Sequence, residues 1–496
     1  MLITLVVTPF LAPSYTRPPP HYGELAMRCK TAMAGCANSH NEKVFISTIL
    51  YDSNGQLAGG LWGQRLHALI HLLGPENVFL SIYENDSGPG GRAALGVFKR
   101  DVRCRHRIVI EDHVSLAGFR NVTLPDGSQR TKRVAYLAEL RNRALWPLDT
   151  LIKFNESSSS SGYNIDMRFD KVLFMNDIAF DPIDAAHLLF NTNRQPELNG
   201  GKAAYVAACA LDYFHPLRIY DVYAMRDAEG YANYQTLFPY FRARPGGRKS
   251  GGLSTSRADI LSQTDAVRVK SCWGGMMAVQ ARYVQSVLKE EEHDQHRQIS
   301  DHVIDPERPR NVTAPIRFRY EPAAYYDACE CCLFSADLAQ VAEQKDMIFA
   351  NPYIRVAYSE SVIGWLRWVR YYERLLVPVH YFQSWFEPLA ENPYRTVEEG
   401  DFFTEEVWDG DRWKMVNRKG RSGLFCGIRD MQILRKDGKR GPDGGGGSNW
   451  VNTRMPPGQR LRFRNWWGKM LPRSWRDKWE RTDMEKREGF FEVEYA

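Results

Sequence analysis

The chain has 496 residues, which is long enough for a large core and for more than one structural unit. Hydrophobic residues make up 44% of it and charged residues 25%, the balance of an ordinary globular protein. The formal net charge of +6 is small for this length, so charge gives no reason to expect a nucleic-acid partner. No window approaches the roughly 18 uninterrupted apolar residues of a membrane-spanning helix.

The chain begins with an apolar run at residues 1–15, which is interrupted by Pro9 and has no basic residue before it. Signal peptides normally start with a positively charged segment, which is missing here. Residues 1–42 are therefore interpreted either as an apolar tail or as a truncated membrane anchor, and both interpretations stay open at this point.

Hydrophobic patterns from residue 43 onward alternate between the strand type and the helix type. Strands are predicted at residues 43–50, 76–86, 169–180 and 203–214. Helices are predicted at 61–74, before a glycine stop, and at 131–147, where Pro147 ends the pattern. This alternation predicts an α/β fold, with a mostly parallel sheet that carries helices on both faces.

Several stretches have compositions that do not fit a buried element. Residues 243–263 are predicted to be a Gly/Ser/Arg-rich loop, 285–310 a charged helix or insert, and 437–458 a low-complexity linker. Basic residues and tryptophans alternate after this linker, which is compatible with a nucleic-acid or membrane-surface role. Docking of this tail onto the core through its tryptophans is the preferred interpretation. Residues 391–496 are accordingly set apart as a C-terminal extension.

Polar residues interrupt the predicted strands near their carboxyl ends. Glu84 and Asp86 end one strand, Asn176 and Asp177 interrupt another, and Asp212 lies late in a third. In a parallel sheet these ends meet at one edge, where ligands bind. The recurrence of polar residues there predicts a binding site at this edge.

Asp177 has the position of a ligand for a divalent cation. Mg²⁺ and Mn²⁺ prefer carboxylate oxygens and often take only one or two from the protein, with phosphate and water completing the shell. Such an ion neutralises charge on a departing diphosphate, which a nucleotide-sugar transferase requires. The alternative role for Asp177 is to cap the next helix, although Asp181 is better placed for that. Kinase, dinucleotide and zinc-protease motifs do not occur.

Six sequence blocks in one order carry a resemblance to a known family. They are RVAYLAELRNRAL, FDKVLFMNDIAF, AACALDYF with IYDVYAMRDAEG, VKSCWGGMMAV, YYDACECCLFSADL and NPYIRVAYS. Together they resemble the fungal capsule-associated mannosyltransferases of glycosyltransferase family 69, which includes the cryptococcal-type α-1,3-mannosyltransferase. The resemblance implies a GT-A-like domain over residues 43–390, GDP-mannose as donor and a mannose-containing glycan as acceptor. It also implies residence in the Golgi or secretory lumen, as a type II membrane protein behind an N-terminal anchor.

The chain departs from the family pattern at the acidic metal motif. The Asp-x-Asp of GT-A enzymes falls on Met175, Asn176 and Asp177, so only the last carboxylate is present. A complete Asp-x-Asp occurs at residues 409–411, outside the resemblance, and is predicted to be a turn. The expected cofactor remains Mn²⁺ or Mg²⁺, held by Asp177.

The resemblance also suggests roles for other polar residues. Glu84 and Asp86 are expected to bind the base or ribose hydroxyls of the donor, and Arg141 its phosphate. Further expected donor contacts are Asn142, Asn176, Trp273, Gly274 and Gly275, where glycines allow close backbone approach and the indole suits a sugar ring. Acceptor recognition or loop closure is expected from Asp221, Arg226 and Asp227.

Glu330, in the block YYDACECCLFSADL, is the first candidate for a catalytic carboxylate near the reacting sugar, and Asp212 is the second. A salt bridge beside a disulfide is the alternative role for Glu330. Cys329, Cys331 and Cys332 surround it, and either a weak zinc motif or disulfides with Cys209, Cys272 or Cys104 would account for them. Glycosylation sequons at Asn85, Asn121, Asn155 and Asn311 permit a lumenal location.

The sequence is compatible with two functions. The first is a metal-dependent, retaining α-mannosyltransferase that contributes to capsule or cell-wall polysaccharide synthesis. The second is a non-catalytic sugar-binding or scaffold protein that kept the fold after losing half of the metal motif.

Overall fold

A computed structural model describes residues 2–149, 167–195, 199–232, 236–242, 253–286, 312–342, 344, 346–386, 392, 394–435, 449–453, 455 and 456. The following predicted segments lie wholly or largely outside these residues: the charged insert at 285–310, the linker at 437–458 and the basic, tryptophan-rich tail.

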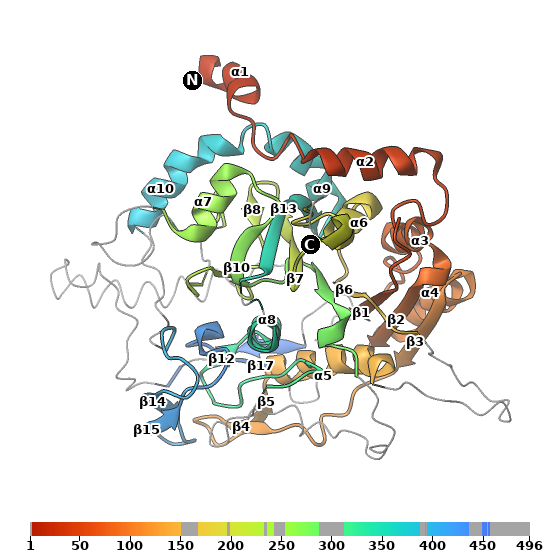
Figure 1. Ribbon diagram of the computed structural model, residues 1–496. Helices are drawn as coiled ribbons and strands as arrows, with labels where there is room; N and C mark the ends of the chain where they lie inside the picture. Colours follow the sequence, from red (N-terminus) through yellow and green to blue (C-terminus); the bar gives the residue numbers. More distant parts are fainter. Residues whose placement is uncertain are drawn as a thin grey trace, which may run out of the picture.

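One mixed sheet of ten strands forms the centre of the molecule, in the order β3-β2-β1-β6-β11-β7-β13-β10-β9, with β8 paired to β7 (Figure 1). The strands are β1 (Val44–Leu50), β2 (Val78–Asn85), β3 (Arg105–Glu111), β6 (Lys171–Met175), β7 (Ala207–His215), β8 (Arg218–Ile219), β9 (Arg226–Asp227), β10 (Val267–Ser271), β11 (Met276–Gln280) and β13 (Ile348–Ala357). All four strands predicted from hydrophobic patterns are present.

Most neighbouring strands of the core run in the same direction. β3, β2, β1 and β6 pair in parallel, as do β7 and β13, while β11 is antiparallel to both β6 and β7. The carboxyl ends of the parallel strands and the start of β11 therefore share one edge, which we call the carboxyl edge. Counted along the chain, the seven strands from β3 to β13 lie in the order 3-2-1-4-6-5-7, and only the sixth is antiparallel. The predicted GT-A-like α/β fold is confirmed.

Helices cover both faces of this sheet (Figure 1). They are α3 (Leu61–Leu73), α4 (Gly88–Asp101), α5 (Arg133–Leu145), α6 (Pro182–Phe190), α7 (Thr255–Ser262), α8 (Glu330–Val341), α9 (Glu360–Val369) and α10 (Leu376–Phe386). α5 and α8 pack together on one face, and α3 packs with α6 on the other. Both predicted helices, α3 and α5, are present. α7 corrects the prediction of a loop at 243–263, because Ile260 is buried and anchors a short helix there.

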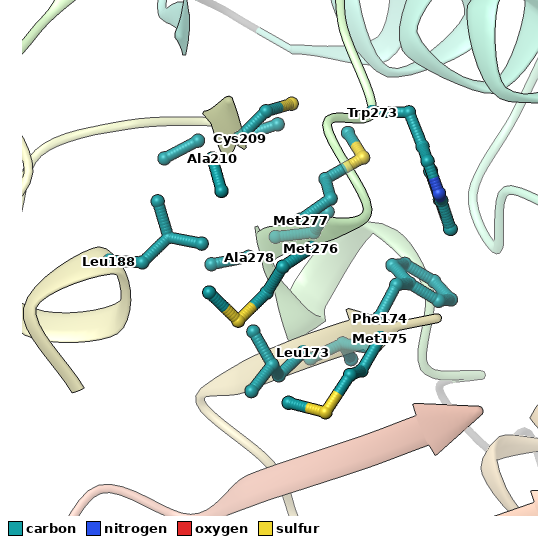
Figure 2. Packing of buried hydrophobic residues seen from close by; sticks show 14 of the residues in the cluster. Leu173, Phe174, Met175, Leu188, Cys209, Ala210, Trp273, Met276, Met277 and Ala278 are labelled. Carbon is teal, nitrogen blue, oxygen red and sulfur yellow. The ribbon is translucent and has the colours of Figure 1, made fainter. Parts of the chain in front are cut away.

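The central strand β6 shows why this sequence forms a buried sheet. All five of its residues are buried, as expected of a strand covered on both faces. Phe174 contacts the ring of Phe334 in α8, with 5.4 Å between centroids. Because side chains alternate along a strand, Leu173 and Met175 point to the opposite face. Figure 2 shows them packed with residues of β7, β11 and α6 in one hydrophobic cluster.

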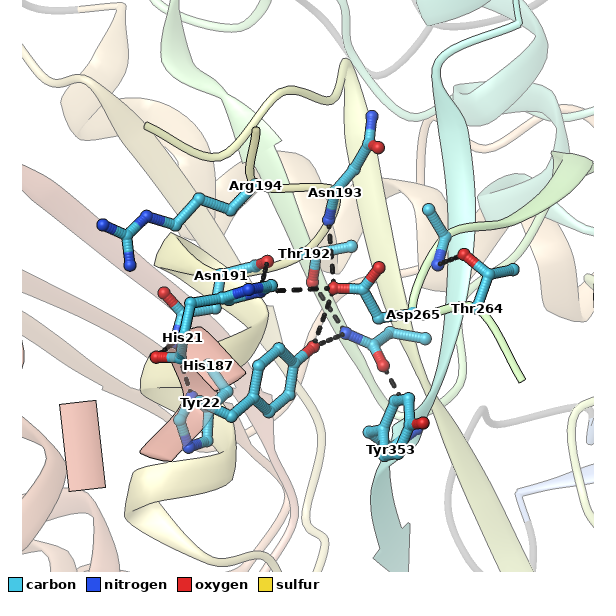
Figure 3. A network of polar contacts seen from close by, with 12 residues as sticks. His21, Tyr22, His187, Asn191, Thr192, Asn193, Arg194, Thr264, Asp265 and Tyr353 are labelled. Carbon is cyan, nitrogen blue, oxygen red and sulfur yellow. Dashed lines mark hydrogen bonds and ion pairs between the residues drawn. The ribbon is translucent and has the colours of Figure 1, made fainter. Parts of the chain in front are cut away.

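The segment before β1 packs against α6 through α2 (Pro20–Arg28), whereas α1 (Leu2–Leu11) projects from the rest of the molecule (Figure 1). A Cys29–Cys36 disulfide follows α2. The ring of Tyr22 stacks on His187 of α6 at 4.4 Å, and its hydroxyl donates to Asp265 at 3.3 Å (Figure 3). Among the described residues, no helix has both the length and the apolar character needed to span a bilayer.

The part of the chain after α10 adds five strands, all in small two-stranded sheets. β14 (Phe402–Trp408) pairs with β15 (Trp413–Lys419), β16 (Gly427–Ile428) pairs with β12 (Asp327–Ala328), and β17 (Gln432–Leu434) pairs with β18 (Trp450–Asn452). A fourth small sheet joins β4 (Asn121–Thr123) to β5 (Gln129–Thr131). A Cys332–Cys426 disulfide ties this part to α8. β18 lies within the residues predicted as a low-complexity linker.

Candidate functional site

Asp177 and Asn176 directly follow β6 at the carboxyl edge. The side chain of Asp177 is exposed, whereas the backbone of Asn176 is fixed by a 2.9 Å hydrogen bond from its N–H to the carbonyl of Gly275. The predicted position of these two residues at a strand end is confirmed. The exposed carboxylate is therefore presented from a rigid backbone.

Asn176 is the centre of a hydrogen-bond network. Its Nδ2 donates to the hydroxyl of Tyr358 at 3.2 Å, while its Oδ1 accepts from the indole Nε1 of Trp273 at 3.3 Å. Only an amide can donate and accept in this way, since an ionised carboxylate has no donor. This gives a physical reason for asparagine where the acidic motif would have its first aspartate. The indole of Trp62 adds a third bond, to the Asn176 carbonyl, at 3.2 Å.

Tyr358, directly after β13, joins this network to Asp212. Its hydroxyl donates to Oδ2 of Asp212 at 3.3 Å. Burial raises the pKa of Tyr358 strongly, and the carboxylates of Asp212 and Asp177 raise it further. The hydroxyl therefore keeps its proton and stays a donor between the two aspartates.

Asp212 and Asp221 form a buried pair of carboxyl groups. Oδ1 of Asp212 accepts the backbone N–H of Asp221 at 3.0 Å. Burial raises the pKa of Asp212 well above its ordinary value, and the nearby Asp221 adds to this. Asp221 is buried too, but it accepts three backbone N–H groups, which oppose the rise in its pKa. Asp212 is thus the member of the pair that holds a proton more readily.

Asp221 fixes the turn that leads into β11. Its Oδ2 accepts the backbone N–H of Trp273 at 3.1 Å and that of Gly274 at 2.8 Å. Gly274 has φ +55°, and a Cβ there would lie 1.9 Å from the carbonyl oxygen of Ala210. The close contact with β7 therefore requires a glycine at this position. The prediction had been that the glycine lets a ligand approach the backbone. At Gly275 a Cβ would come within 3.0 Å of Ile178.

Trp273, Arg141 and Glu330 form a buried stack behind this turn. The guanidinium of Arg141 lies 4.1 Å from the centroid of the Trp273 indole, and its Nε donates to Glu330 at 3.1 Å. One indole face thus carries a cation in place of the predicted sugar, and Trp273 is only 4% exposed. Burial alone would lower the pKa of Arg141, but Cys331 and Glu330 raise it, so the guanidinium stays charged.

The cysteines around Glu330 do not pair as predicted. Cys332 bonds Cys426, and Cys209 bonds Cys272, while the buried Cys329 and Cys331 are free. Ligand atoms of Cys329, Glu330 and Cys331 lie within 4.8 Å of one another, as a metal site would require. The charged Arg141 already occupies Oε1 of Glu330, which disfavours a second cation there.

Glu84 and Asp86 lie at the carboxyl end of β2, as predicted. β1 separates β2 from β6, so two strand spacings, about 10 Å, lie between Glu84 and Asp177 along the sheet. The backbone N–H of Ser87 donates to Glu84, whose pKa is raised by burial. Asp86 has φ +64° and pairs with His113 at 2.7 Å.

Three predicted site residues contact other parts of the chain. The amide of Asn142 makes two hydrogen bonds with the backbone of Phe318, at 2.8 and 2.9 Å. The guanidinium of Arg226 donates to carbonyl groups that include those of Phe425 and Cys426. Asp227 forms an ion pair with the buried Arg242. The residues predicted for acceptor recognition or loop closure are therefore divided. Asp212 and Asp221 reach the network at the carboxyl edge, whereas Arg226 and Asp227 hold loops together.

Two predictions about aspartates outside this network are confirmed. Asp181 caps α6 by accepting the N–H of Ile183 at 3.0 Å, which leaves Asp177 without that role. Residues 409–411 form the turn between β14 and β15, where Asp409 accepts the backbone N–H groups of Asp411 and Arg412. The complete Asp-x-Asp is thus a hairpin turn.

Sequence reasoning gave no role to Trp62, His113 or Tyr358. Tyr358 lies in the block NPYIRVAYS, directly after a strand. Its position at the carboxyl edge could therefore have been predicted from the sequence. Trp62 and His113 have no such signal, because their partners are far apart in the sequence. All three add hydrogen-bond donors or acceptors to residues at this edge.

The carboxyl edge fits a divalent cation together with a diphosphate. One exposed carboxylate, Asp177, is a sufficient protein contribution for Mg²⁺ or Mn²⁺ when phosphate oxygens and water complete the shell. Asp86, about two strand spacings away, presents a further carboxylate at the same edge, whereas Glu84 is buried and accepts the N–H of Ser87. The edge is long enough for an extended ligand that carries both a base and a phosphate.

Comparison with protein families connects the chain to glycosyl transfer. The family model for cryptococcal mannosyltransferase 1 matches residues 43–337. No curated protein matches the chain in sequence. The solved mannosyltransferase PcManGT from Pyrobaculum calidifontis, in complex with GDP-Man and Mn²⁺, is 11% identical, with 79% of this chain and 77% of that chain covered and a TM-score of 0.31.

Glucosyl-3-phosphoglycerate synthase from Mycobacterium tuberculosis is also 11% identical, with 82% of this chain and 96% of that chain covered and a TM-score of 0.29. At TM-scores this low the solved structures support no further statement about this chain. The family model spans more than half of the chain and includes β1, β2, β6, β7 and β11 of the carboxyl edge, while β13 follows the matched residues. The chain therefore belongs to the cryptococcal mannosyltransferase 1 family.

Proposed function

We propose that the chain transfers mannose from GDP-mannose to a mannose-containing glycan and forms an α-1,3 linkage with retention of configuration. The observation that carries this proposal is the exposed Asp177 on a rigid backbone at the carboxyl edge, in a member of a mannosyltransferase family. Mn²⁺ or Mg²⁺ bound there would neutralise charge on the departing diphosphate. GDP-Man and Mn²⁺ occur together in the solved Pyrobaculum enzyme, which makes them the first donor and ion to test.

The chain's own residues would bind and orient the donor along the carboxyl edge. Asp177 faces the diphosphate, while Glu84 and Asp86, about 10 Å along the sheet, receive the base or ribose hydroxyls. Asn176 holds Tyr358 and Trp273 in fixed positions, which preorganises the site and lowers the cost of reaching a reactive geometry.

Asp212 and Glu330 would take different parts in the reaction. Asp212 accepts a hydrogen bond from Tyr358, whose hydroxyl also contacts Asn176 beside Asp177, and burial raises the pKa of Asp212, which favours its protonated form. Glu330 is further away, behind Trp273, and is bound to Arg141. We therefore propose Asp212 as the carboxyl group nearer the reacting atoms and Glu330 as a positioning residue.

The experiment is a donor hydrolysis assay with the purified chain. GDP-mannose, GDP-glucose and UDP-sugars are each incubated with Mn²⁺, Mg²⁺ or a chelator, and release of free nucleotide is followed. We expect release from GDP-mannose that depends on the metal ion. Binding of donor without any release would favour the non-catalytic alternative, which the missing first carboxylate at Asn176 supports.

We further propose that the chain resides in the lumen of the secretory pathway and associates with membrane through its N-terminus. Three disulfides support this location, since disulfides persist in oxidising compartments. The exposed sequon at Asn121 also supports it, whereas Asn85 is buried. Glycosidase treatment of the chain expressed in a eukaryotic host should shift its mass, and Asn121→Gln should remove part of that shift.

A further inference from the structure

Exposed aromatic and aliphatic side chains occur on α1, on α9 and the turn after it, and on α10. Figure 1 shows these three helices. We call the group the aromatic face, and its members are Phe10, Leu11, Trp365, Trp368, Tyr371, Tyr372 and Val379. Single exposed hydrophobic residues are ordinary on a protein surface, but several on neighbouring segments indicate an interaction site.

The sequence of α9 explains how the face arises. Val362 and Leu366 are buried and pack on the core, as the inner side of an amphipathic helix should. Trp365 and Trp368 lie three residues apart on the outer side, where they are 61% and 65% exposed. The helix is thus apolar on two sides, and the core uses only one of them.

α1 is held beside the end of α9. The backbone N–H of Ser14 donates to the carbonyl of Arg370 at 2.9 Å, and the guanidinium of Arg370 donates to the carbonyl of Tyr15 at 3.0 Å. Phe10 and Leu11, at the end of α1, are 77% and 80% exposed. These contacts fix the apolar end of α1 next to the exposed tryptophans.

The charges around the face are mostly positive. Residues 360–386 contain only two carboxylates, and each is bound to an arginine: Glu360 to Arg65 and Glu373 to Arg355. Arg367, which lies between Trp365 and Trp368 in the sequence, has 84% of its side chain exposed, with Asp181 3.7 Å away. An exposed cation on the same helix as the exposed tryptophans suits a partner with anionic groups above an apolar layer.

We propose that the aromatic face docks on the surface of an anionic lipid bilayer. Tryptophan and tyrosine combine an apolar ring with a polar N–H or O–H, and they collect at the boundary between headgroups and acyl chains. Arg367 would contact lipid phosphate or carboxylate groups. This contact goes beyond the association through the N-terminus proposed above, because a lateral surface of the folded chain forms it.

The face is rigidly connected to the carboxyl edge. α9 begins two residues after Tyr358, whose hydroxyl contacts Asn176 and Asp212. Docking of α9 in the plane of the bilayer would therefore set the direction in which the carboxyl edge faces. An acceptor held near the membrane would meet this edge in one orientation.

The test is sedimentation of the full chain with vesicles of phosphatidylcholine, with and without phosphatidylserine. We expect stronger binding to the anionic vesicles, and a loss of about tenfold in partitioning for Trp365→Ala/Trp368→Ala, because two rings leave the interface. Arg367→Gln should weaken only the preference for phosphatidylserine. Phe402→Ala is the matched control, since Phe402 is 86% exposed on β14, outside the aromatic face.

Three outcomes would overturn the proposal. Unchanged vesicle binding by Trp365→Ala/Trp368→Ala would assign any binding to another part of the chain, such as the basic tail or α1 alone. Absence of vesicle binding by the wild type would exclude a lipid surface. A wild-type dimer in light scattering that the double variant dissociates, without vesicle binding, would make the partner a second copy. Thermal unfolding and metal-dependent release of nucleotide provide readouts that the double variant should not change.

Discussion

The guanidinium of Arg141 lies over the indole of Trp273, and the same arginine is the ion-pair partner of the buried Glu330. The indole in turn donates to Asn176. Glu330, Arg141 and Trp273 therefore connect the interior of the protein to the backbone that presents Asp177. A change at Arg141 should therefore affect both stability and the donor site.

Arg141→Met should destabilise the fold by about 3–5 kcal/mol, because it leaves the buried carboxylate of Glu330 without its cation. Urea unfolding with intact disulfides measures this loss. Arg367→Met is the control, since its exposed side chain should change stability by less than about 0.5 kcal/mol. Arg141→Met/Glu330→Gln should recover part of the loss, and a strictly additive double variant would contradict the importance of the pair.

Asp177→Asn should abolish metal-dependent binding of GDP-mannose and leave the fold intact, since the side chain is exposed and its volume is preserved. Calorimetry with and without Mn²⁺ measures the effect. Asp411→Asn changes an aspartate of the complete Asp-x-Asp in the hairpin turn and should have no effect on binding. Equal affinity of Asp177→Asn with and without the ion, at the wild-type value, would remove Asp177 from the metal site.

Glu330→Gln and Asp212→Asn separate the two catalytic candidates. If Glu330 only positions Arg141, its variant should lower kcat moderately and be rescued in part by Glu330→Asp, which keeps the charge. Asp212→Asn should lower kcat more and shift the pH profile of turnover, because the titrating group near the reacting atoms is removed. The assay is metal-dependent nucleotide release across pH. A larger loss in Glu330→Gln, with a shifted pH profile, would restore Glu330 as the catalytic carboxylate.

The unfolding free energy should depend on pH through Asp212. Its pKa is raised by burial in the folded state, so the native protein binds more protons than the unfolded chain at pH values above the ordinary aspartate pKa of about 4. Stability from this group is therefore present below about pH 4 and is lost as pH rises toward the raised pKa. Asp212→Asn should show a smaller decline between pH 5 and 8, measured in urea with a chelator. Identical slopes for both proteins would contradict the raised pKa.

Thiol titration of the denatured, unreduced chain should give three free thiols, from Cys104, Cys329 and Cys331. Reduction should raise this to nine, the number of cysteines in the sequence. Cys426→Ser should expose one more thiol and lower stability by about 2–4 kcal/mol, since the Cys332–Cys426 disulfide closes a long loop. Nine free thiols before reduction would place the chain in a reducing compartment.

Local patterns in the sequence were sufficient for the strands and helices that carry strong periodicity. β1, β2, β6 and α3 follow from apolar runs, glycine stops and turn residues within a few positions. α4 was not predicted because its first residues, Gly88 to Gly91, have low helix propensity. The burial of Leu95 and Phe98 in the core stabilises the helix instead. β11 was not predicted. The apolar run after Gly275 is short, and nothing in its local sequence indicates a strand that runs antiparallel to its neighbours.

The candidate site was predictable in place but only partly in contacts. Glu84 and Asp177 were correctly assigned to strand ends, because the position of a residue along a strand is local information, whereas Asp212 lies inside β7, three residues before its end. The partners of Trp273 and Arg226 were not, since Arg141 and Phe425 are more than 100 residues away. A single sequence also cannot distinguish a tryptophan that stacks on a sugar from one that stacks on an arginine.

Arg226 and the Cys332–Cys426 disulfide bear on how the chain would behave toward proteases. The guanidinium of Arg226 is buried and donates to the carbonyls of Phe425 and Cys426, and β16 pairs with β12 beside them. A chain cut once between residues 386 and 394 would therefore keep its two fragments together through one covalent bond and a buried set of hydrogen bonds. On a non-reducing gel such a nicked protein would migrate as a single species, and reductant would release a fragment that begins after the cut.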